Sequence, residues 1–380
     1  MSGMRIALQA ADLDARRVDG TRTYIRELTR RFGGVAPDDT FIICHRDSFN
    51  PELAPPEKPN YEFLALPGER LWMQTAFAGA LYRIRPDRIF IPLQAAPVAT
   101  PSGSELIATV HDLAFRFFPD TFPASDRAKL NLLLGVLVSK ASRIIAVSES
   151  TKTDLLRFYP SLNASNVYVI HHGVDAGFFA REISEADRNA VLMPHGLESE
   201  SYALYVGALQ PRKNLIRLVL AFERAKEKHP DMKLVIVGET AWLSDAIVTR
   251  MERSPHASDI IRVGQAPTST LPIWYQNARF LAFPSLYEGF GLPILEAFAA
   301  GTPVLTGNIS SLPEVGGDAA LYVDPYLEED IAEKLGRLWV DTDLRDELRK
   351  KGRERVKAFS WDRCARETLS VIRGGSGEDI

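Results

Sequence analysis

Two glutamates separated by seven residues lie where an apolar run gives way to a helix-forming segment, Phe283-Pro-Ser-Leu-Tyr-Glu-Gly-Phe-Gly-Leu-Pro-Ile-Leu-Glu296. Glu288 falls in the loop after the apolar run, and Pro293 stands where a helix would begin, a position that suits proline. Glu296 then lies on the first turns of that helix. We therefore expect one carboxylate to reach a bound group from the loop and the other to reach it from the helix.

The same loop has the composition of an anion-binding site. Gly289 and Gly291 allow the backbone to approach a ligand closely, and Phe290 and Leu292 complete a run of backbone N–H groups before the helix. Such N–H groups at a helix N-terminus bind phosphate. Taken alone, Glu296 has a simpler explanation, because its charge also favours the positive end of the helix dipole.

A basic pair occurs at a second junction between a strand and a helix, in Val206-Gly-Ala-Leu-Gln-Pro-Arg-Lys-Asn214. Arg212 and Lys213 precede a segment whose apolar residues recur at helical spacing, with Asn214 as its expected cap. Cations at the start of a helix face the unfavourable end of its dipole. That cost favours an anionic partner for the pair, the alternative being two solvated side chains.

Short apolar runs alternate with helical segments along the whole chain, which is typical of βα units and parallel sheets. Continuous runs of Ile, Val and Leu indicate strands that are buried on both faces. The expected strands of the first series are 5–9, 41–44, 88–91, 106–110, 143–147 and 167–170, and those of the second series are 203–206, 233–237, 260–263, 280–283 and 303–306.

The polar stretch 180–201 lacks a clear strand or a long helix, and it separates the two series of strands. We therefore predict an α/β fold with two doubly wound, Rossmann-like domains, residues 1–180 and 181–359. Residues 360–373 are expected to form a C-terminal helix that returns to the first domain, and 374–380 to form a tail. Ligands of such domains bind in the cleft outside the carboxyl ends of the strands.

Composition excludes several classes of protein. The 380 residues carry a net charge of -4, so no excess of Lys and Arg is available for coating nucleic acid. Cys44 and Cys364 can form neither a disulfide framework nor a Cys-x-x-Cys metal site. The longest apolar stretch has about seven residues, against the ~20 that span a bilayer. Arg5 and Asp12 interrupt any apolar signal region, and we expect a cytoplasmic protein.

The two junctions resemble those of retaining nucleotide-sugar glycosyltransferases of family 4, which have the GT-B fold. The segment from Glu288 to Glu296 resembles the Glu-(seven residues)-Glu motif of that family, and the loop 206–214 resembles its phosphate-clamping loop. Other matches, in chain order, are His111-Asp112, Ala146-Val-Ser-Glu-Ser150, Ile170-His-His-Gly-Val-Asp175 and Ser310-Ser-Leu-Pro-Glu-Val315.

The resemblance implies a nucleoside-diphosphate sugar that is bound mainly by the C-terminal domain. Arg212 and Lys213 would then grip the diphosphate, where cations stabilise the charge that develops on the leaving group. Glu288 would contact the transferred sugar, and Glu296 would accept two hydrogen bonds from the ribose hydroxyls. Gly207 belongs to the same donor-binding loop as the basic pair.

The resemblance also assigns a saccharide or lipid-linked glycan acceptor to the N-terminal domain. His111 follows a buried strand of that domain and is the histidine expected near the reacting carbon of the sugar. Gly20 and Thr21, after the first strand, resemble a loop that approaches the diphosphate from the other side.

No cofactor is expected, because the nucleotide sugar is a substrate. Asp12-Leu-Asp14 superficially resembles the metal-binding Asp-x-Asp of another glycosyltransferase fold. The GT-B fold does not require such a metal, so we expect no metal site here.

One departure from the family concerns the donor. Many members carry Arg directly after the loop glycine, where this chain has Ala208. Arg212 beside Lys213 would replace it, in a Pro-Arg-Lys-Asn pattern that is often found in mannosyltransferases. This pattern favours GDP-mannose as donor, with a UDP-sugar as the alternative.

Retention of the anomeric configuration could use a carboxylate nucleophile. The family resemblance favours a front-face reaction instead, in which the departing phosphate accepts the proton of the acceptor. In that reaction Glu288 would orient and stabilise the sugar rather than attack it.

An arginine stripe lies on the helix expected at 21–32, where Arg22, Arg26 and Arg30 recur at every fourth residue. Such a stripe fits an anionic membrane surface or a lipid-linked diphosphate acceptor. A solvated helix face is the simpler explanation.

We conclude from the sequence that the chain is a retaining hexosyltransferase that uses a nucleotide sugar. A sugar-nucleotide epimerase or hydrolase on the same fold is a second interpretation. A non-enzymatic nucleotide-sugar sensor is a third, against which Lys213 and the intact pair of Glu288 and Glu296 argue. A dinucleotide oxidoreductase is disfavoured, because no Gly-x-Gly-x-x-Gly follows an early strand.

Overall fold

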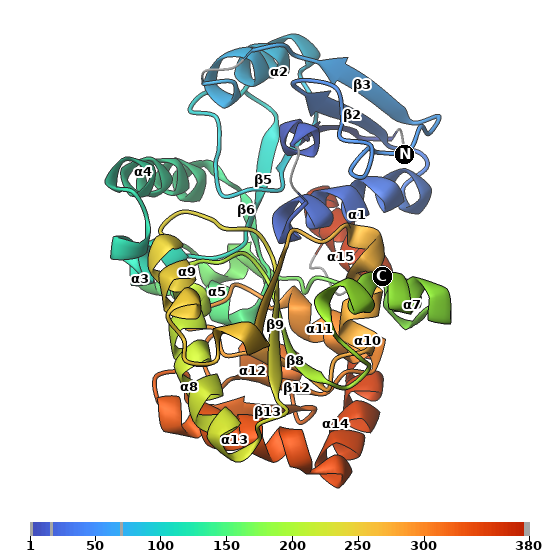
Figure 1. Ribbon diagram of the computed structural model, residues 1–380. Coiled ribbons are helices and arrows are strands. Elements are labelled where there is room, and N and C mark those ends of the chain that lie inside the picture. The colour runs from blue at the N-terminus through green and yellow to red at the C-terminus, as the bar shows by residue number, and fades with distance from the viewer. Residues whose placement is uncertain (1–2, 16–17, 69–70, 376–380) are drawn as a thin grey trace. The chain divides into compact units, whose positions relative to one another are not determined.

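The computed structural model describes residues 3–15, 18–68 and 71–375. The described chain forms two compact units, each built on one parallel sheet with helices packed around it (Figure 1). The first unit comprises the chain up to Phe117, Pro123–Gly173 and the segment that begins at Trp361. The second unit comprises Phe118–Phe122 and Val174–Ser360.

Seven strands form the sheet of the first unit, in the order β3-β2-β1-β4-β5-β6-β7, and all neighbours are parallel. The sequence predicts six of them and misses β3, an edge strand whose Glu62 and Phe63 are exposed, so that it lacks a continuous apolar run. The strands are β1 (Arg5–Gln9), β2 (Thr40–His45), β3 (Tyr61–Ala65), β4 (Arg88–Ile91), β5 (Glu105–Val110), β6 (Arg143–Ala146) and β7 (Val167–Val169).

The helices of the first unit include the expected C-terminal one, which packs against α1. There the Nε of Arg31 donates to Asp362 at 2.6 Å, and the Nε of Arg373 donates to Asp39 at 2.8 Å. The helices are α1 (Gly20–Val35), α2 (Ala78–Ile84), α3 (Ala114–Phe117), α4 (Ala124–Lys140), α5 (Glu149–Phe158) and α15 (Trp361–Arg373).

Six parallel strands form the sheet of the second unit, in the order β10-β9-β8-β11-β12-β13. Five are predicted from the sequence, and the sixth, β13, is an edge strand whose two central residues are only half-buried. The strands are β8 (Tyr202–Val206), β9 (Lys233–Val237), β10 (Ile260–Gly264), β11 (Phe280–Phe283), β12 (Val304–Gly307) and β13 (Ala320–Val323).

From β8 to β13 the strands of the second unit alternate with single helices, while α6 and α7 precede β8, and α13 and α14 follow β13. The helix after β11 begins one residue before Pro293, as the sequence predicts. The helices are α6 (Ala176–Ala180), α7 (Glu185–Leu192), α8 (Leu215–Lys228), α9 (Asp245–Glu252), α10 (Leu271–Gln276), α11 (Leu292–Ala300), α12 (Leu312–Gly316), α13 (Glu328–Val340) and α14 (Thr342–Arg355).

The chain order of each sheet reverses at one point. In the first sheet it reverses between β1 and β4, and in the second between β8 and β11. At such a point two adjacent loops diverge to opposite faces of the sheet, which opens a crevice at the carboxyl ends of the strands. The loops with the two sequence motifs of the second unit follow β8 and β11, so both lie at its reversal point.

The division of the chain differs in detail from the expected one at residue 180. The chain passes from the first unit to the second after Gly173 and returns to the first at Trp361, and the short segment Phe118–Phe122 belongs to the second unit. The polar stretch 180–201 is not devoid of regular structure either, since it contains α7. Of the expected tail 374–380, residues 376–380 lie outside the described part of the chain.

Candidate active site

Two cations and one carboxylate meet at the reversal point of the second sheet. The Nζ of Lys213 donates to Oε1 of Glu288 at 2.5 Å, and an Nη of Arg212 donates to Oε2 at 3.2 Å. The same Arg212 nitrogen donates to the carbonyl of Tyr287 at 2.9 Å. The structure therefore brings Glu288 together with two adjacent cations that lie some 75 positions earlier in the chain.

The three side chains are almost completely buried, with 16%, 12% and 8% of the surfaces of Arg212, Lys213 and Glu288 exposed. Burial disfavours the charged form of Glu288. The charges of Lys213 and Arg212 and the hydrogen bonds of the carboxylate outweigh burial and hold its pKa below the usual value of 4.5. Glu288 is therefore ionised at neutral pH.

The loop that carries the cations is fastened to the loop that carries Glu288. The backbone N–H of Leu286 donates to the carbonyl of Arg212 at 2.8 Å. The buried amide of Asn214 donates to the carbonyls of Pro284, at 3.0 Å, and Pro325, at 2.6 Å. Asn214 is the N-cap residue of α8, as the sequence predicts, but its side chain makes no capping hydrogen bond to the helix backbone. Its amide nitrogen bonds beyond the ends of β11 and β13 instead, and its Oδ1 accepts from Arg217.

Two serines that follow β12 hold the backbone around Glu288. Oγ of Ser310 accepts a hydrogen bond from the N–H of Glu288 at 3.1 Å. Oγ of Ser311 is within donating distance of the carbonyls of Glu288, at 2.9 Å, and Phe290, at 2.7 Å. These serines belong to the Ser310–Val315 match, but nothing in their local sequence pattern indicates this contact.

The glycine-rich segment before α11 is buried. Gly291 has a φ of +119°, which favours glycine, and a Cβ there would lie 3.3 Å from the side chain of Leu312. Phe290 packs its ring against Phe359 with 5.9 Å between centroids. Gly289 is buried and Leu292 half-buried, so this segment is fixed by packing as well as by the serines.

The second glutamate of the motif contacts a different group. Glu296 is half-buried on α11, and its Oε2 accepts a hydrogen bond from the phenol of Tyr275 at 2.6 Å. Burial raises the pKa of Glu296 above the usual carboxyl value, and the Tyr275 bond partly offsets that rise. Tyr275 is fully buried on α10 and was not singled out in the sequence.

A pocket of about 320 Å³ opens at the carboxyl ends of β9 and β10, and its walls include Leu209, Ile236, Glu239, Thr240, Arg262 and Gln265. Gly207, from the predicted donor loop, lies beside it. A Cβ on Gly238 would come within 1.9 Å of the Gly207 carbonyl oxygen, so only glycine permits this close approach of two loops.

His111 lies in the first unit, directly after β5. Its Nε2 is 2.9 Å from the carbonyl oxygen of Pro92, which can only accept, so Nε2 carries the proton and Nδ1 is left as the acceptor. Burial lowers the pKa of His111, with partial compensation from the Pro92 carbonyl and from nearby carboxylates. The imidazole is therefore neutral at neutral pH, and its ring contacts that of Tyr24 edge to face at 5.2 Å.

The sequence predicts a loop at Gly20 and Thr21, but the structure does not have one there. They are the first residues of α1, where Asp19 caps the helix by accepting from the N–H of Arg22 at 3.1 Å. The Asp19 carboxylate lies within electrostatic range of His111, so the start of α1 and His111 share one edge of the first sheet.

The two aspartates that resemble a metal-binding motif are engaged in other contacts. Asp14 accepts two hydrogen bonds from Arg46, each at 2.9 Å, and Asp12 accepts one from Gln9 at 3.1 Å. Among the residues that the structure describes, no group of three or more His, Cys, Asp or Glu side chains could hold a metal ion.

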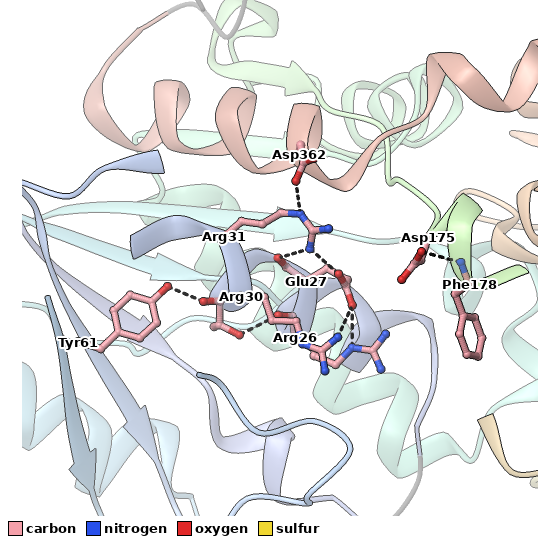
Figure 2. Close-up of polar contacts among 9 residues, drawn as sticks. Arg26, Glu27, Arg30, Arg31, Tyr61, Asp175, Phe178 and Asp362 are labelled. Carbon is pink, nitrogen blue, oxygen red and sulfur yellow. Dashed lines mark hydrogen bonds and ion pairs between the residues drawn. The ribbon is translucent and has the colours of Figure 1, made fainter. Parts of the chain in front are cut away.

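The arginines of the α1 stripe pair with acidic neighbours, and Figure 2 shows the contacts of Arg26 and Arg30. Glu27 accepts from Arg26 at 2.8 Å and from Arg30 at 3.4 Å, and it also pairs with Arg31. Arg22 pairs with Asp19. Within the described ranges, no helix has the length and apolar character needed to cross a membrane.

Family models match both units. The model described as Glycosyltransferase Family 4 matches residues 18–178, and the model described as Glycosyl transferases group 1 matches residues 192–355. The chain is 30% identical over 271 residues to the O-antigen chain mannosyltransferase B of Escherichia coli. The matched region covers 70% of this chain and 70% of that relative. It is 29% identical over 252 residues to the alpha-maltose-1-phosphate synthase of Mycolicibacterium smegmatis, covering 62% of this chain and 64% of that one.

Solved structures share the fold at lower identity. The sucrose-phosphate synthase of Thermosynechococcus elongatus superposes with a TM-score of 0.76 at 22% identity, over 97% of this chain and 98% of that one. WaaG, a glycosyltransferase involved in lipopolysaccharide biosynthesis, superposes with a TM-score of 0.74 at 15% identity, over 97% of this chain and 100% of that one. These similarities show the fold predicted from the sequence.

The lowered pKa of Glu288 predicts a specific pH dependence of stability. Because the folded protein prefers the ionised carboxylate, Glu288 contributes stability above about pH 4.5, and this contribution is lost as the pH falls through the lower folded pKa. We therefore expect Glu288→Gln to unfold at a lower urea concentration than the wild type at neutral pH, and the difference to shrink below about pH 4.5.

Glu227→Gln is the matched control, because Glu227 is exposed on the outer side of α8. Urea denaturation followed by circular dichroism measures all three proteins across the acidic range. A constant difference between Glu288→Gln and the wild type at every pH would contradict the assignment of an ion-paired carboxylate.

Proposed function

The chain belongs to glycosyltransferase family 4 and is a hexosyltransferase, and from that premise we propose that it transfers mannose from GDP-mannose to a saccharide or lipid-linked glycan. Retention of configuration and a front-face mechanism are part of the proposal. The 30% identical relative from Escherichia coli is named as a mannosyltransferase, which supports the sugar. A UDP-sugar is the alternative donor, since a solved neighbour from Anabaena, with a TM-score of 0.73, is named as a complex with UDP-glucose.

The observation that carries the proposal is the buried cluster of Arg212, Lys213 and Glu288. Two cations converge on one carboxylate in a cluster that is nearly buried. A diphosphate suits such a pair of cations, because its oxygens accept charge-assisted hydrogen bonds from both.

In the proposed mechanism the cations change partners when the donor binds. Lys213 and Arg212 turn from Glu288 toward the diphosphate and stabilise the charge that develops as the glycosidic bond breaks. Glu288, released from them, accepts hydrogen bonds from the hydroxyls of the sugar. A phosphate oxygen of the leaving group accepts the proton of the attacking acceptor hydroxyl on the same face, so the configuration is retained.

The pocket beside Gly207 is proposed to receive the nucleobase. Glu239 contributes a carboxylate to its wall, and Arg262 and Gln265 contribute donors. Guanine presents two adjacent N–H donors that one carboxylate can accept together, whereas uracil presents one N–H. The carboxylate of Glu239 therefore supports guanine as the base of the donor.

The acceptor is proposed to bind to the first unit, where His111 offers the acceptor nitrogen Nδ1. A lipid-linked acceptor would bring α1 to an anionic membrane surface, to which Arg30, 46% exposed, could contribute positive charge. Its pairing with Glu27 reduces that attraction.

Flotation with anionic liposomes tests the proposed membrane contact of α1. Recovery of all the protein in the soluble fraction would contradict that contact.

A panel of GDP-, UDP-, ADP- and dTDP-sugars tests the donor. We expect thermal stabilisation and acceptor-dependent nucleotide release with GDP-mannose, and we expect Glu239→Gln to lower GDP affinity by about tenfold while leaving UDP affinity unchanged. Glu227→Gln, on the exposed side of α8 and away from the pocket walls, is the control. Release without an acceptor would indicate a hydrolase, and binding without release for any acceptor would indicate a sensor.

Removal of a charge from the cluster is expected to slow turnover. Lys213→Ala and Glu288→Ala should each lower kcat at least tenfold, which corresponds to about 1.4 kcal/mol of transition-state stabilisation. The measurement is nucleotide release at saturating donor and acceptor. Lys228→Ala, at the opposite end of α8, serves as the control and should keep the wild-type rate. Wild-type rates for both cluster variants would remove the proposed roles of the cluster.

A further inference from the structure

A fully buried phenol holds the carboxylate of Glu296. The hydroxyl of Tyr275 donates to Oε2 of Glu296 at 2.6 Å. Tyr275 is itself fixed on three sides: its carbonyl accepts from Oγ1 of Thr302 at 2.7 Å, its ring meets that of Phe179 edge to face at 5.6 Å, and α10 packs against α11. The phenol is therefore a rigid donor aimed at one carboxylate oxygen.

The chemistry of the pair leaves a defined set of acceptor sites. Burial raises the pKa of Tyr275 well above the usual phenol value, and the charge of Glu296 raises it further, so the hydroxyl keeps its proton at neutral pH. A tyrosine has one O–H donor, and an ionised carboxylate has about four lone-pair sites. One site on Oε2 is thus occupied by the phenol, which favours one orientation of the carboxylate.

We propose that Tyr275 is a positioning residue that fixes the Glu296 carboxylate so that it accepts hydrogen bonds from the two adjacent hydroxyls of a ribose. This inference rests on the proposed function, in which Glu296 contacts the ribose of the donor. Two neighbouring hydroxyls demand a carboxylate of fixed orientation, because both hydrogen bonds form only within a narrow range of angles. A carboxylate that is already held loses less conformational entropy on binding.

A second buried tyrosine of the same unit shows what a purely structural phenol contacts. Tyr202 on β8 is also fully buried, and its hydroxyl donates to the backbone carbonyl of Trp274 at 2.8 Å. That partner is a fixed group of the main chain. Glu296, in contrast, is a half-buried and rotatable side chain on the helix that follows the Glu288 loop, so its orientation needs a partner such as Tyr275.

The test compares a ribonucleotide with its analogue that lacks both hydroxyls. Isothermal titration calorimetry with GDP and with 2′,3′-dideoxy-GDP, or with the corresponding uridine pair if the donor panel selects UDP, gives the preference for ribose. We expect a preference of about tenfold or more in the wild type, a preference below about threefold in Tyr275→Phe, and the wild-type preference in Tyr202→Phe, which loses a buried phenol elsewhere. Tyr275→Phe should also raise the KM for the donor with little change in kcat.

A double-mutant cycle keeps the inference falsifiable if Tyr275→Phe weakens the fold. In the Glu296→Gln background the ribose preference should already be low, and the addition of Tyr275→Phe should change it by less than about twofold. If Tyr275→Phe binds both nucleotides more weakly by the same factor, the preference for ribose survives. That result would overturn the positioning role of Tyr275 and leave the proposed function standing. A wild-type protein that binds neither nucleotide would overturn the proposed function and this inference with it.

Discussion

The ion pairs between Glu288 and the cations Lys213 and Arg212 are the interaction on which the site depends. Charges that leave water lose several kcal/mol of solvation each, which their mutual attraction recovers only in good geometry. Here the two contacts, at 2.5 and 3.2 Å, engage both carboxylate oxygens. The pairing keeps the cluster charged inside the protein, and it holds both cations close to the loop where the diphosphate is proposed to bind.

Much of the second unit serves to bring these three side chains together. The reversal of strand order between β8 and β11 places the two loops side by side at one edge of the sheet. The Asn214 amide then joins the first loop to the ends of β11 and β13, and Ser310 and Ser311 hold the backbone of the second. The loops that carry the chemistry are thus anchored by buried hydrogen bonds rather than left to move independently.

The sequence predicts what depends on local pattern. The buried strands follow from apolar runs, and the start of α11 next to Pro293 follows from the preference of proline for the first turn of a helix. The edge strands β3 and β13 are missed because partial exposure weakens that pattern. The role of Asn214 is missed for another reason: its partners, Pro284 and Pro325, are 70 and 111 residues away along the chain, and no local rule predicts them.

The same distinction applies to the candidate site. The types and spacing of Arg212, Lys213 and Glu288 indicate an anion site, but their direct pairing appears only when the strand order is known. Tyr275 could not be found from the sequence, because a tyrosine in a short apolar helix looks like any core residue. The acidic partners of the α1 arginines are local, at i+1 and i−3, and a count of charges on that helix face would have found Glu27.

The central claim is that Lys213 and Arg212 exchange Glu288 for a diphosphate. A crystal structure of the complex with GDP, grown in Mg²⁺-free buffer, tests this claim most directly. The account predicts Nζ of Lys213 at about 3 Å from a phosphate oxygen, with its contact to Oε1 of Glu288 lengthened beyond hydrogen-bond distance. A complex in which the nucleotide is bound while Lys213 remains 2.5 Å from Glu288, with no phosphate oxygen in reach, would contradict it.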